Sequence, residues 1–424
     1  MHRCVLLKHG EVVLKGRNRG RFEEVLRRNL RAALEGAGPV RIRTGRSVTV
    51  VSGDAPVEEL VERVRRVPGF NLVQPAVSVP RDPEAVAEAA VGLLRERGPV
   101  AGGFAVRARR RHKDFPLDSA RLAALVGARV RRELGLPVDL TSPAVEVAVE
   151  VDRREVYVSV ERLPGEGGLP VGTGGRAVAL LSGGYDSPVA AHRAMRRGLR
   201  CDFVHFTGAP YTGPASAYKA YALVRELTRH QPGARLYVVP LGTAQRALAT
   251  AGAGRYQVVA QRRLMVRTAA ELARRTGAGA LVTGDSLGQV ASQTLSNIAT
   301  VDEASPLPVL RPLLGWDKTE IMAEAERIGT AAVSRLSDED CCSLLLPPRV
   351  ATGSTPGRLA RVERRIDVDQ TVEELLERAQ VMYPGRKDGG AGRGGAAVCG
   401  TAAGTARQDD GAPEAGEDPS PAVA

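Results

Sequence analysis

Residues 178–187 read Val-Ala-Leu-Leu-Ser-Gly-Gly-Tyr-Asp-Ser, a short apolar run followed by a glycine-rich turn. A helix-like stretch follows from Pro188. Glycine lets the backbone approach a ligand closely, and the free N–H groups at the start of a helix attract anions. The stretch therefore predicts a phosphate-binding loop between a buried strand and a helix. The alternative is a glycine-rich turn that binds nothing.

The type of loop follows from what it contains. The chain has no Gly-x-x-x-x-Gly-Lys-Ser/Thr, so the loop is not a Walker A motif. The order Ser-Gly-Gly-x-Asp-Ser after a strand instead resembles the pyrophosphate loop (PP-loop) of the ATP pyrophosphatases. That resemblance implies cleavage of ATP between its α and β phosphates, with AMP left on a substrate oxygen.

Strands and helices alternate around this loop. Periodicity predicts strands at 177–181, 201–206, 235–239 and 280–283, with helices at 188–197, 215–229 and 256–275 between them. Such alternation is typical of an α/β fold with a doubly wound parallel sheet. Ligands of such folds bind at the carboxyl ends of the strands.

The rest of the chain divides by composition and pattern. Residues 1–65 alternate strands and helices as a small α+β domain of ferredoxin-like type does, and residues 66–162 form a second α+β unit. Residues 163–175 hold six glycines and two prolines, which predicts a linker. The α/β domain is then expected at 176–385, and the lack of hydrophobic periodicity predicts a disordered tail at 386–424.

The net charge of +12 points to a polyanionic partner such as RNA, although an arginine-rich genome is an alternative cause. Residues 1–170 carry 30 basic and 22 acidic side chains, so the excess extends into the N-terminal part. The five cysteines favour a reducing cytoplasm over a disulfide scaffold. No apolar run reaches the length of a membrane span, and no signal peptide precedes the first strand.

Polar residues after the first two predicted strands are candidates for the nucleotide site. Asp186 would hold a magnesium ion or orient the loop, or alternatively cap the following helix. His205 and Phe206 follow the next strand. Phe206 would pack on adenine, or the pair belongs to the core.

Further candidates come from the second half of this domain. Arg262 and Arg263 are adjacent on a helix, so at most one of them faces the site. Gly284 permits close backbone approach after the strand at 280–283, and Gln293 would read an amide or base edge. Lys318 in the first turn of a helix opposes the dipole preference for acids, which suggests that it faces phosphate.

Cys341 and Cys342 lie in the run Asp-Glu-Asp-Cys-Cys-Ser. Adjacent cysteines do not match the usual zinc spacing, and the chain has no Cys-x-x-Cys for an iron–sulfur cluster. The pair would carry sulfur as a persulfide or attack one. The alternative is two small buried side chains.

The densest basic cluster of the chain spans residues 107–113 and precedes a predicted helix start at Asp118-Ser119. Arginines and a helix N-terminus together would grip phosphates. A solvated surface is the alternative. The candidate RNA-binding residues are Arg107, Arg109, Arg110, Arg111 and Lys113.

Taken together, these motifs resemble the tRNA 4-thiouridine sulfurtransferases, a family also tied to thiamine thiazole synthesis. The resemblance covers roughly residues 1–382. It rests on Gly10-Glu-Val-Val-Leu-Lys-Gly-Arg-Asn18, on the cluster at 107–117 as the start of a THUMP RNA-binding module, on the loop at 182–188, and above all on 283–295.

The resemblance implies a mechanism and its residues. ATP and magnesium would adenylate a uridine of tRNA, expected at position 8, and persulfide sulfur from a cysteine desulfurase would then replace the oxygen. Cys341 would handle the sulfur, alone or with Cys342, since we expect the form without the rhodanese domain that some members append. Asp186 and Lys318 would assist at the phosphates. The implied ATP-binding residues are Leu180, Leu181, Ser182, Gly183, Gly184, Ser187, His205, Phe206, Arg262, Gly284 and Gln293.

The resemblance also implies further partners and a place in the cell. Family members are often homodimers, and a sulfur-carrier protein is a candidate partner through the thiamine role. The expected location is the cytoplasm. Two other functions compete: an amide-forming ligase with the same loop, and a non-catalytic RNA-binding protein with a degenerate nucleotide fold.

Overall fold

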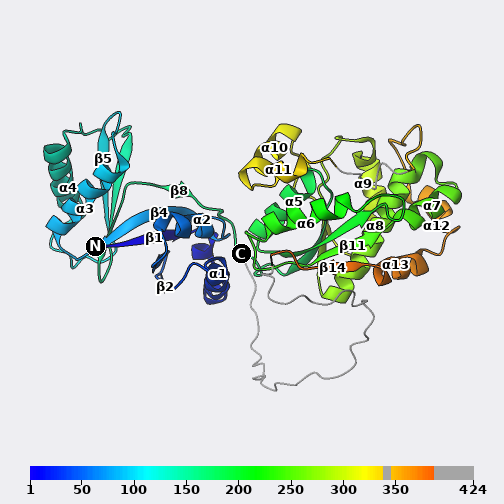
Figure 1. Ribbon diagram of the computed structural model, residues 1–424, viewed down its shortest axis with the longest axis horizontal. Helices are drawn as coiled ribbons and strands as arrows, with labels where there is room; N and C mark the ends of the chain where they lie inside the picture. Colours follow the sequence, from blue (N-terminus) through cyan, green and yellow to red (C-terminus); the bar gives the residue numbers. More distant parts are fainter. Residues whose placement is uncertain (338–344, 386–424) are drawn as a thin grey trace, which may run out of the picture.

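The structure is a computed structural model that describes residues 1–337 and 345–385, and within these ranges the strands form two β-sheets. Figure 1 shows the sheets in two bodies side by side, the N-terminal half in blue and cyan and the C-terminal half in green to orange. The expected tail at 386–424 lies outside the described residues.

The N-terminal sheet has the strand order β2-β3-β1-β4-β7-β6-β5, and β8 pairs with β4. Its helices α1 and α2 pack over β1 and β3, whereas α3 and α4 pack over β5, β6 and β7. The elements of this half are β1 (His2–His9), η1 (Glu11–Leu14), α1 (Arg19–Ala33), β2 (Val40–Thr44), β3 (Val48–Gly53), α2 (Val57–Val64), β4 (Phe70–Val79), α3 (Pro83–Arg97), β5 (Phe104–Arg110), α4 (Ser119–Leu134), β6 (Val145–Val151), β7 (Val156–Ser159) and β8 (Leu163–Pro164).

Strand β4 belongs to both α+β units of this half. One edge of β4 pairs antiparallel with β1 over almost its whole length, and the other pairs with β7 through Val77 and Val158. The two units, expected as 1–65 and 66–162, therefore share one continuous sheet. Strand β4 was not among the elements predicted from the sequence.

The C-terminal sheet has the order β13-β12-β9-β10-β11-β14, parallel except for β14. The predicted doubly wound parallel sheet is confirmed. Its elements are β9 (Arg176–Leu180), α5 (Asp186–Arg196), β10 (Arg200–Thr207), α6 (Ala215–Leu227), β11 (Leu236–Pro240), α7 (Gly242–Thr250), η2 (Gly254–Tyr256), α8 (Gln257–Thr276), β12 (Ala280–Val282), η3 (Ala291–Gln293), α9 (Leu295–Asp302), β13 (Val309–Leu310), α10 (Lys318–Arg327), α11 (Ala331–Ser334), α12 (Pro356–Glu363), α13 (Val368–Glu377) and β14 (Gln380–Met382).

Successive side chains of β9 pack alternately into two different hydrophobic cores. Ala177 and Ala179 pack with α5, α6 and α10 on one face, whereas Val178 packs with α7, α8 and α13 on the other. This period of two is what a strand covered on both faces requires. The carboxyl ends of β9, β10 and β12 consequently meet at one edge of the sheet, where the predicted loop begins.

Residues 163–175 connect the two halves and are held against both. Leu169 and Val171 are buried, and the Glu166 carboxylate is buried as well. Glycine is needed here, since a Cβ on Gly168 would lie 2.1 Å from the carbonyl oxygen of Arg196. The glycine-rich composition therefore serves a close approach of backbones. Among the described helices, none has the length and apolarity to cross a bilayer.

Candidate active site

The loop after β9 is closed by its own serines. The Ser187 hydroxyl oxygen accepts a hydrogen bond from the Ser182 backbone N–H at 2.8 Å and lies 3.0 Å from the Ser182 hydroxyl. Helix α5 begins directly afterwards, and no side chain caps its N-terminus. Its first N–H groups and its dipole therefore point into the loop without a side-chain acceptor, as an anion-binding helix start requires.

A second backbone segment packs against the loop at Gly284, which follows β12. A Cβ at Gly284 would lie 2.6 Å from the backbone nitrogen of Ser187 and 2.8 Å from the carbonyl carbon of Asp186. Both clashing atoms are backbone and cannot move aside cheaply. The glycine thus allows the end of β12 to support the phosphate loop directly.

A cavity of about 530 Å³ opens beside the loop, at the carboxyl ends of β9, β10 and β12. This volume is within the range of small-molecule sites. Of the sequence-predicted ATP-binding residues, Gly183 and Gly184 belong to the loop without lining the cavity. The others line it, together with Asp186: Leu180, Leu181, Ser182, Ser187, His205, Phe206, Arg262, Gly284 and Gln293.

His205 and Phe206 are both buried, yet both face the cavity at the end of β10. Nδ1 of His205 lies 2.9 Å from the carbonyl oxygen of Leu181, which fixes the ring against the loop. The two residues therefore belong to the core and are also placed where they can contact a nucleotide.

The side chains of Arg262 and Arg263 point in different directions, as their adjacent positions on α8 predict. Arg262 reaches the cavity, and its NH1 lies 3.2 Å from the Ser292 hydroxyl oxygen. Arg263 is buried on another side, where its Nε donates to Glu363 at 2.6 Å.

Asp285 is a buried anion of the site that was not among the residues predicted from the sequence. Arg262 donates to one carboxylate oxygen, and Arg311 donates to the other at 3.0 Å. Thr283 and Gln293 donate to the same carboxylate at 2.8 and 3.3 Å. Burial opposes ionisation of Asp285, but the two guanidinium groups outweigh it and hold the pKa below its ordinary value. Its position directly after Gly284 was the available signal.

Asp186 and Lys318 meet beside the loop. Nζ of Lys318 donates to Oδ1 of Asp186 at 2.7 Å, and Gln289 donates to Oδ2 at 3.2 Å. Tyr185 precedes α5 as its N-cap, so Asp186 does not cap this helix, and that alternative is wrong. A capping box between Asp317 and Glu320 starts α10 and thereby orients Lys318.

The predicted sulfur-handling residues Cys341 and Cys342 lie outside the described residues. The chain on both sides of them contacts the site. Ser334 donates to the carbonyl oxygen of Gly184 at 3.2 Å, and Leu346 lines the cavity.

The predicted RNA-binding residues are placed on and after β5, at the edge of the N-terminal sheet. Arg107, Arg109 and Lys113 are exposed. Arg110 instead donates to the carbonyl oxygen of Leu117 at 3.1 Å, and Arg111 donates to Glu150 at 2.6 Å. The cluster is thus divided between exposed cations and cations that hold the fold.

A basic hollow of about 750 Å³ lies where the two α+β units meet. Arg109 and Arg111 line it together with arginines that the sequence analysis missed, namely Arg43, Arg46, Arg153 and Arg154. Arg43 lies on β2, and the other three lie in the β2–β3 and β6–β7 turns, so only the fold brings them beside the cluster at 107–113.

Three family descriptions match successive parts of the chain. Residues 4–73 match the ThiI ferredoxin-like domain, residues 80–161 the THUMP domain, and residues 172–368 the family described as thiamine biosynthesis protein (ThiI).

Similar proteins span nearly the whole chain. The probable tRNA sulfurtransferase of Nocardia farcinica is 62% identical over 91% of this chain and 95% of that protein. The probable tRNA sulfurtransferase of Thermus thermophilus is 41% identical over 89% of this chain and 93% of that protein. The crystal structure of a 4-thiouridine synthetase–RNA complex with bound ATP matches with a TM-score of 0.83 and 32% identity, covering 91% of this chain and all of that one.

Proposed function

Because this chain belongs to the tRNA sulfurtransferase family, we propose that it uses ATP to replace the C4 oxygen of a tRNA uridine with sulfur. The family resemblance of the sequence is thereby confirmed. The observation that carries the proposal is the cavity beside the phosphate loop, with the Asp186–Lys318 pair next to it.

The first step is adenylation. The uridine O4 attacks the α-phosphate of ATP, pyrophosphate leaves, and O4 becomes part of an AMP ester. A carbonyl oxygen is a poor leaving group, whereas AMP is a good one. The uncapped start of α5 and the Lys318 ammonium supply positive charge where the pyrophosphate charge develops.

Magnesium fits the donors of this loop. Asp186 offers carboxylate oxygens beside the phosphate site, which is the ligand type that Mg²⁺ prefers. The ion would offset phosphate charge, with Asp186 as its protein ligand.

The second step brings sulfur to C4. The terminal sulfur of a Cys341 persulfide attacks C4, and AMP leaves with the original oxygen. Attack by Cys342 on the Cys341 sulfur then leaves 4-thiouridine and a disulfide that an external thiol reduces. Leu346 lies five positions after Cys341, and five residue steps span at most about 18 Å, so Cys341 stays within that reach of the cavity wall.

The remaining partners belong to the same proposal. A cysteine desulfurase supplies the persulfide, and the target uridine is at position 8 of the tRNA. The protein acts in the cytoplasm as a homodimer. Its Arg107, Arg109 and Lys113 side chains contact tRNA phosphates. Transfer of sulfur to a carrier protein for thiamine synthesis is a second use of the persulfide, and growth of a deletion strain without thiamine tests it.

The experiment combines purified protein, tRNA, ATP and a cysteine desulfurase, with AMP, pyrophosphate and 4-thiouridine measured separately. We expect all three from the natural chain. Cys341→Ser should still release pyrophosphate and leave AMP on the uridine, but form no 4-thiouridine, and Cys399→Ser is the matched control. Amide formation without thiolation would identify a ligase, and tRNA binding without AMP would identify a non-catalytic protein.

A further inference from the structure

The segment 165–169 forms a joint between the two halves of the molecule. On one side, the Gly167 N–H donates to the carbonyl oxygen of Phe70 at 2.8 Å, and the Gly69 N–H donates back to Gly167 at 2.7 Å. On the other side, the Leu169 N–H donates to the carbonyl oxygen of Arg196 at the end of α5. The joint therefore ties β4 of the RNA-binding half to α5 of the nucleotide-binding half.

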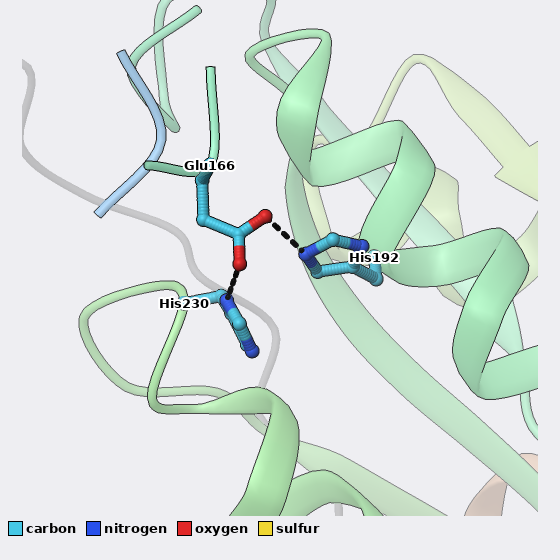
Figure 2. A group of neighbouring side chains, drawn as sticks. All are labelled: Glu166, His192 and His230. Atoms are coloured by element: carbon cyan, nitrogen blue, oxygen red, sulfur yellow. Dashed lines mark hydrogen bonds and ion pairs between the residues drawn. The ribbon is translucent and has the colours of Figure 1, made fainter. Parts of the chain in front are cut away.

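Glu166 lies in the middle of this joint and points into the C-terminal half. Figure 2 shows its carboxylate between two histidines, His192 from α5 and His230 from the turn after α6. Nε2 of His192 lies 3.1 Å from one carboxylate oxygen, and Nδ1 of His230 lies 3.5 Å from the other. All three side chains are at least nine-tenths buried.

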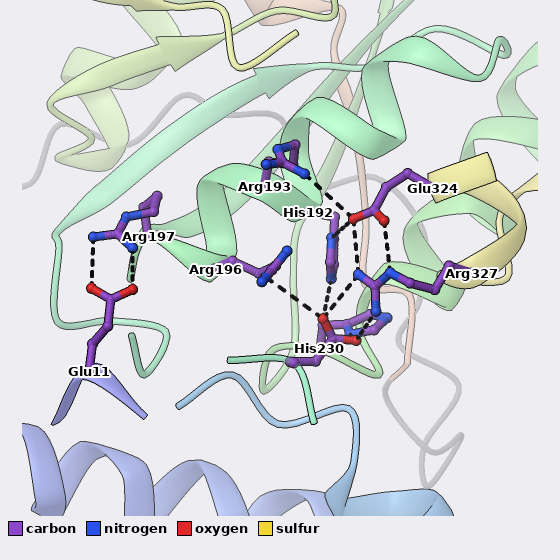
Figure 3. Close-up of polar contacts among 9 residues, drawn as sticks. Glu11, His192, Arg193, Arg196, Arg197, His230, Glu324 and Arg327 are labelled. Atoms are coloured by element: carbon purple, nitrogen blue, oxygen red, sulfur yellow. Dashed lines mark hydrogen bonds and ion pairs between the residues drawn. The ribbon is translucent and has the colours of Figure 1, made fainter. Parts of the chain in front are cut away.

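Arginines complete the surroundings of this carboxylate. Arg327 at the end of α10 donates to both oxygens of Glu166 at 3.1 and 3.2 Å, and Nε of Arg196 lies 4.0 Å away. Figure 3 shows these cations converging from α5 and α10. Burial alone would raise the pKa of Glu166, but His192, His230 and Arg327 lower it to about 2, so the group is an anion at neutral pH.

Glu166, His192 and His230 also have the composition of a metal site. The geometry favours a different role. The two histidines face different carboxylate oxygens, and Arg327 donates to both oxygens. The carboxylate thus lies at the centre of a ring of donors, whereas in a metal site the cation takes that position.

The two helices that contact Glu166 also carry Asp186 and Lys318, the pair beside the phosphate loop. Helix α5 starts at Asp186 and reaches the joint with His192 and Arg196, and α10 starts at Lys318 and reaches the joint with Arg327. One end of each helix therefore lies at the phosphate loop and the other at the joint.

A second ion pair crosses between the halves nearby. Arg197, just after α5, donates to both carboxylate oxygens of Glu11 at 2.7 and 3.1 Å. Glu11 belongs to the Gly10–Asn18 signature of the RNA-binding half. This pair is more exposed than Glu166 and provides an independent way to weaken the same connection.

We propose that Glu166 is a positioning residue for thiolation, which fixes the RNA-binding half relative to the phosphate loop so that the target uridine of bound tRNA lies over the loop. The inference rests on the proposed function, because it concerns the placement of that substrate. Glu166 is buried and does not line the cavity beside the phosphate loop. Its loss therefore lowers the rate of a bound complex and leaves the binding of each substrate intact, since small misplacements of reactants cost large factors in rate.

The test compares Glu166→Gln with the natural full-length chain in single-turnover thiolation with saturating ATP and tRNA. We expect the rate to fall by about tenfold or more. The dissociation constants for tRNA and for ATP should each stay within about twofold. Asp202→Asn is the matched control, because Asp202 is an equally buried carboxylate that pairs with Arg176 and Arg235 inside the C-terminal half.

The outcomes are separable. A folded Glu166→Gln protein that thiolates at the natural rate overturns the inference, and so does a loss of rate explained by weaker tRNA or ATP binding. If Glu166→Gln does not fold, Glu11→Gln decides in the same assay: a lower rate with unchanged affinities supports the joint, and an unchanged rate overturns it. One equivalent of zinc in the natural chain that is absent from Glu166→Gln would also overturn it, in favour of a metal site. Failure of the natural chain itself to thiolate would contradict the proposed function instead.

Discussion

The Nζ atom of Lys318 lies 2.7 Å from Oδ1 of Asp186, which joins the first turn of α10 to the first turn of α5. The dipole of α10 disfavours a cation at this position, and the Asp186 carboxylate offsets that cost. Tyr185 lies under the ammonium group, 5.5 Å from ring centroid to nitrogen. The pair keeps a cation beside the loop, where the proposed mechanism places the developing phosphate charge.

Replacing this cation should slow the chemistry more than it weakens binding. For Lys318→Met we expect pyrophosphate release with ATP and tRNA to fall by at least about 100-fold, because an electrostatic contact to the developing charge is lost. The ATP dissociation constant should change by less than about tenfold. Arg335→Gln, which removes an exposed cation paired with Glu326, is the control and should release pyrophosphate normally.

The close approach at Gly284 gives a second prediction. In Gly284→Ala, the new methyl group would meet the backbone of Asp186 and Ser187 and displace the phosphate loop. We expect ATP binding, measured by calorimetry, to weaken by at least about tenfold, about 1.4 kcal/mol. Gly279→Ala is matched in size and lies just before the same strand in open space, so its ATP affinity should be unchanged. Equal affinities for both variants would contradict the supporting role of Gly284.

Asp285→Asn tests the buried anion of the cavity. The change removes the negative charge that Arg262 and Arg311 share as a partner. Removing one partner of a buried ion pair lowers the free energy of unfolding by about 3–5 kcal/mol. We expect a lower urea midpoint and a KM for ATP that rises by about tenfold, since Arg262 loses its fixed position. Asp302→Asn removes the other partner of Arg311, a half-buried carboxylate that is more accessible than Asp285, and should have smaller effects on both quantities.

Mild acid should destabilise the C-terminal half through His230. Burial, helped by His192, lowers the pKa of His230 from 6.5 to about 3. Between these values the unfolded chain binds a proton that the folded chain does not, so stability falls as the pH drops below about 6.5. This residue contributes a slope of up to about 1.4 kcal/mol per pH unit.

Urea unfolding at pH 7 and pH 5 measures that slope, with the single Trp316 reporting on the C-terminal half. His230→Asn should lose less stability between the two pH values than the natural chain. The half-buried His112 of the N-terminal half serves as control, and His112→Asn should keep the natural slope. A natural slope in His230→Asn would show that other groups cause the acid sensitivity.

The architecture of the C-terminal half could be predicted from the sequence alone. Its strands, such as 177–181, are short apolar segments, and the helices between them have apolar residues at helical spacing. It also led to Asp186 after the glycine-rich turn, to Gly284 after a strand, and to Lys318, a cation where the helix dipole disfavours one. These signals are local, and a single chain segment is enough to reveal them.

What the sequence could not reveal depends on contacts between distant segments. Glu166, His192 and His230 lie in a linker, a helix and a turn, and none of these contexts marks them as neighbours. Strand β4 contains Pro75 and follows a Pro-Gly break, which hides a strand that two units share. Asp285 matters because Arg262 and Arg311 converge on it, and that convergence is a property of the fold.

Strand β4 gives the N-terminal half an indivisible character. A protease cut or gene truncation between residues 65 and 70 would leave either fragment with an unpaired sheet edge, because β1 and β7 pair with opposite edges of β4. Duplication or loss of one unit without the other would meet the same obstacle. The two units are therefore expected to be inherited together and to move together as one rigid part.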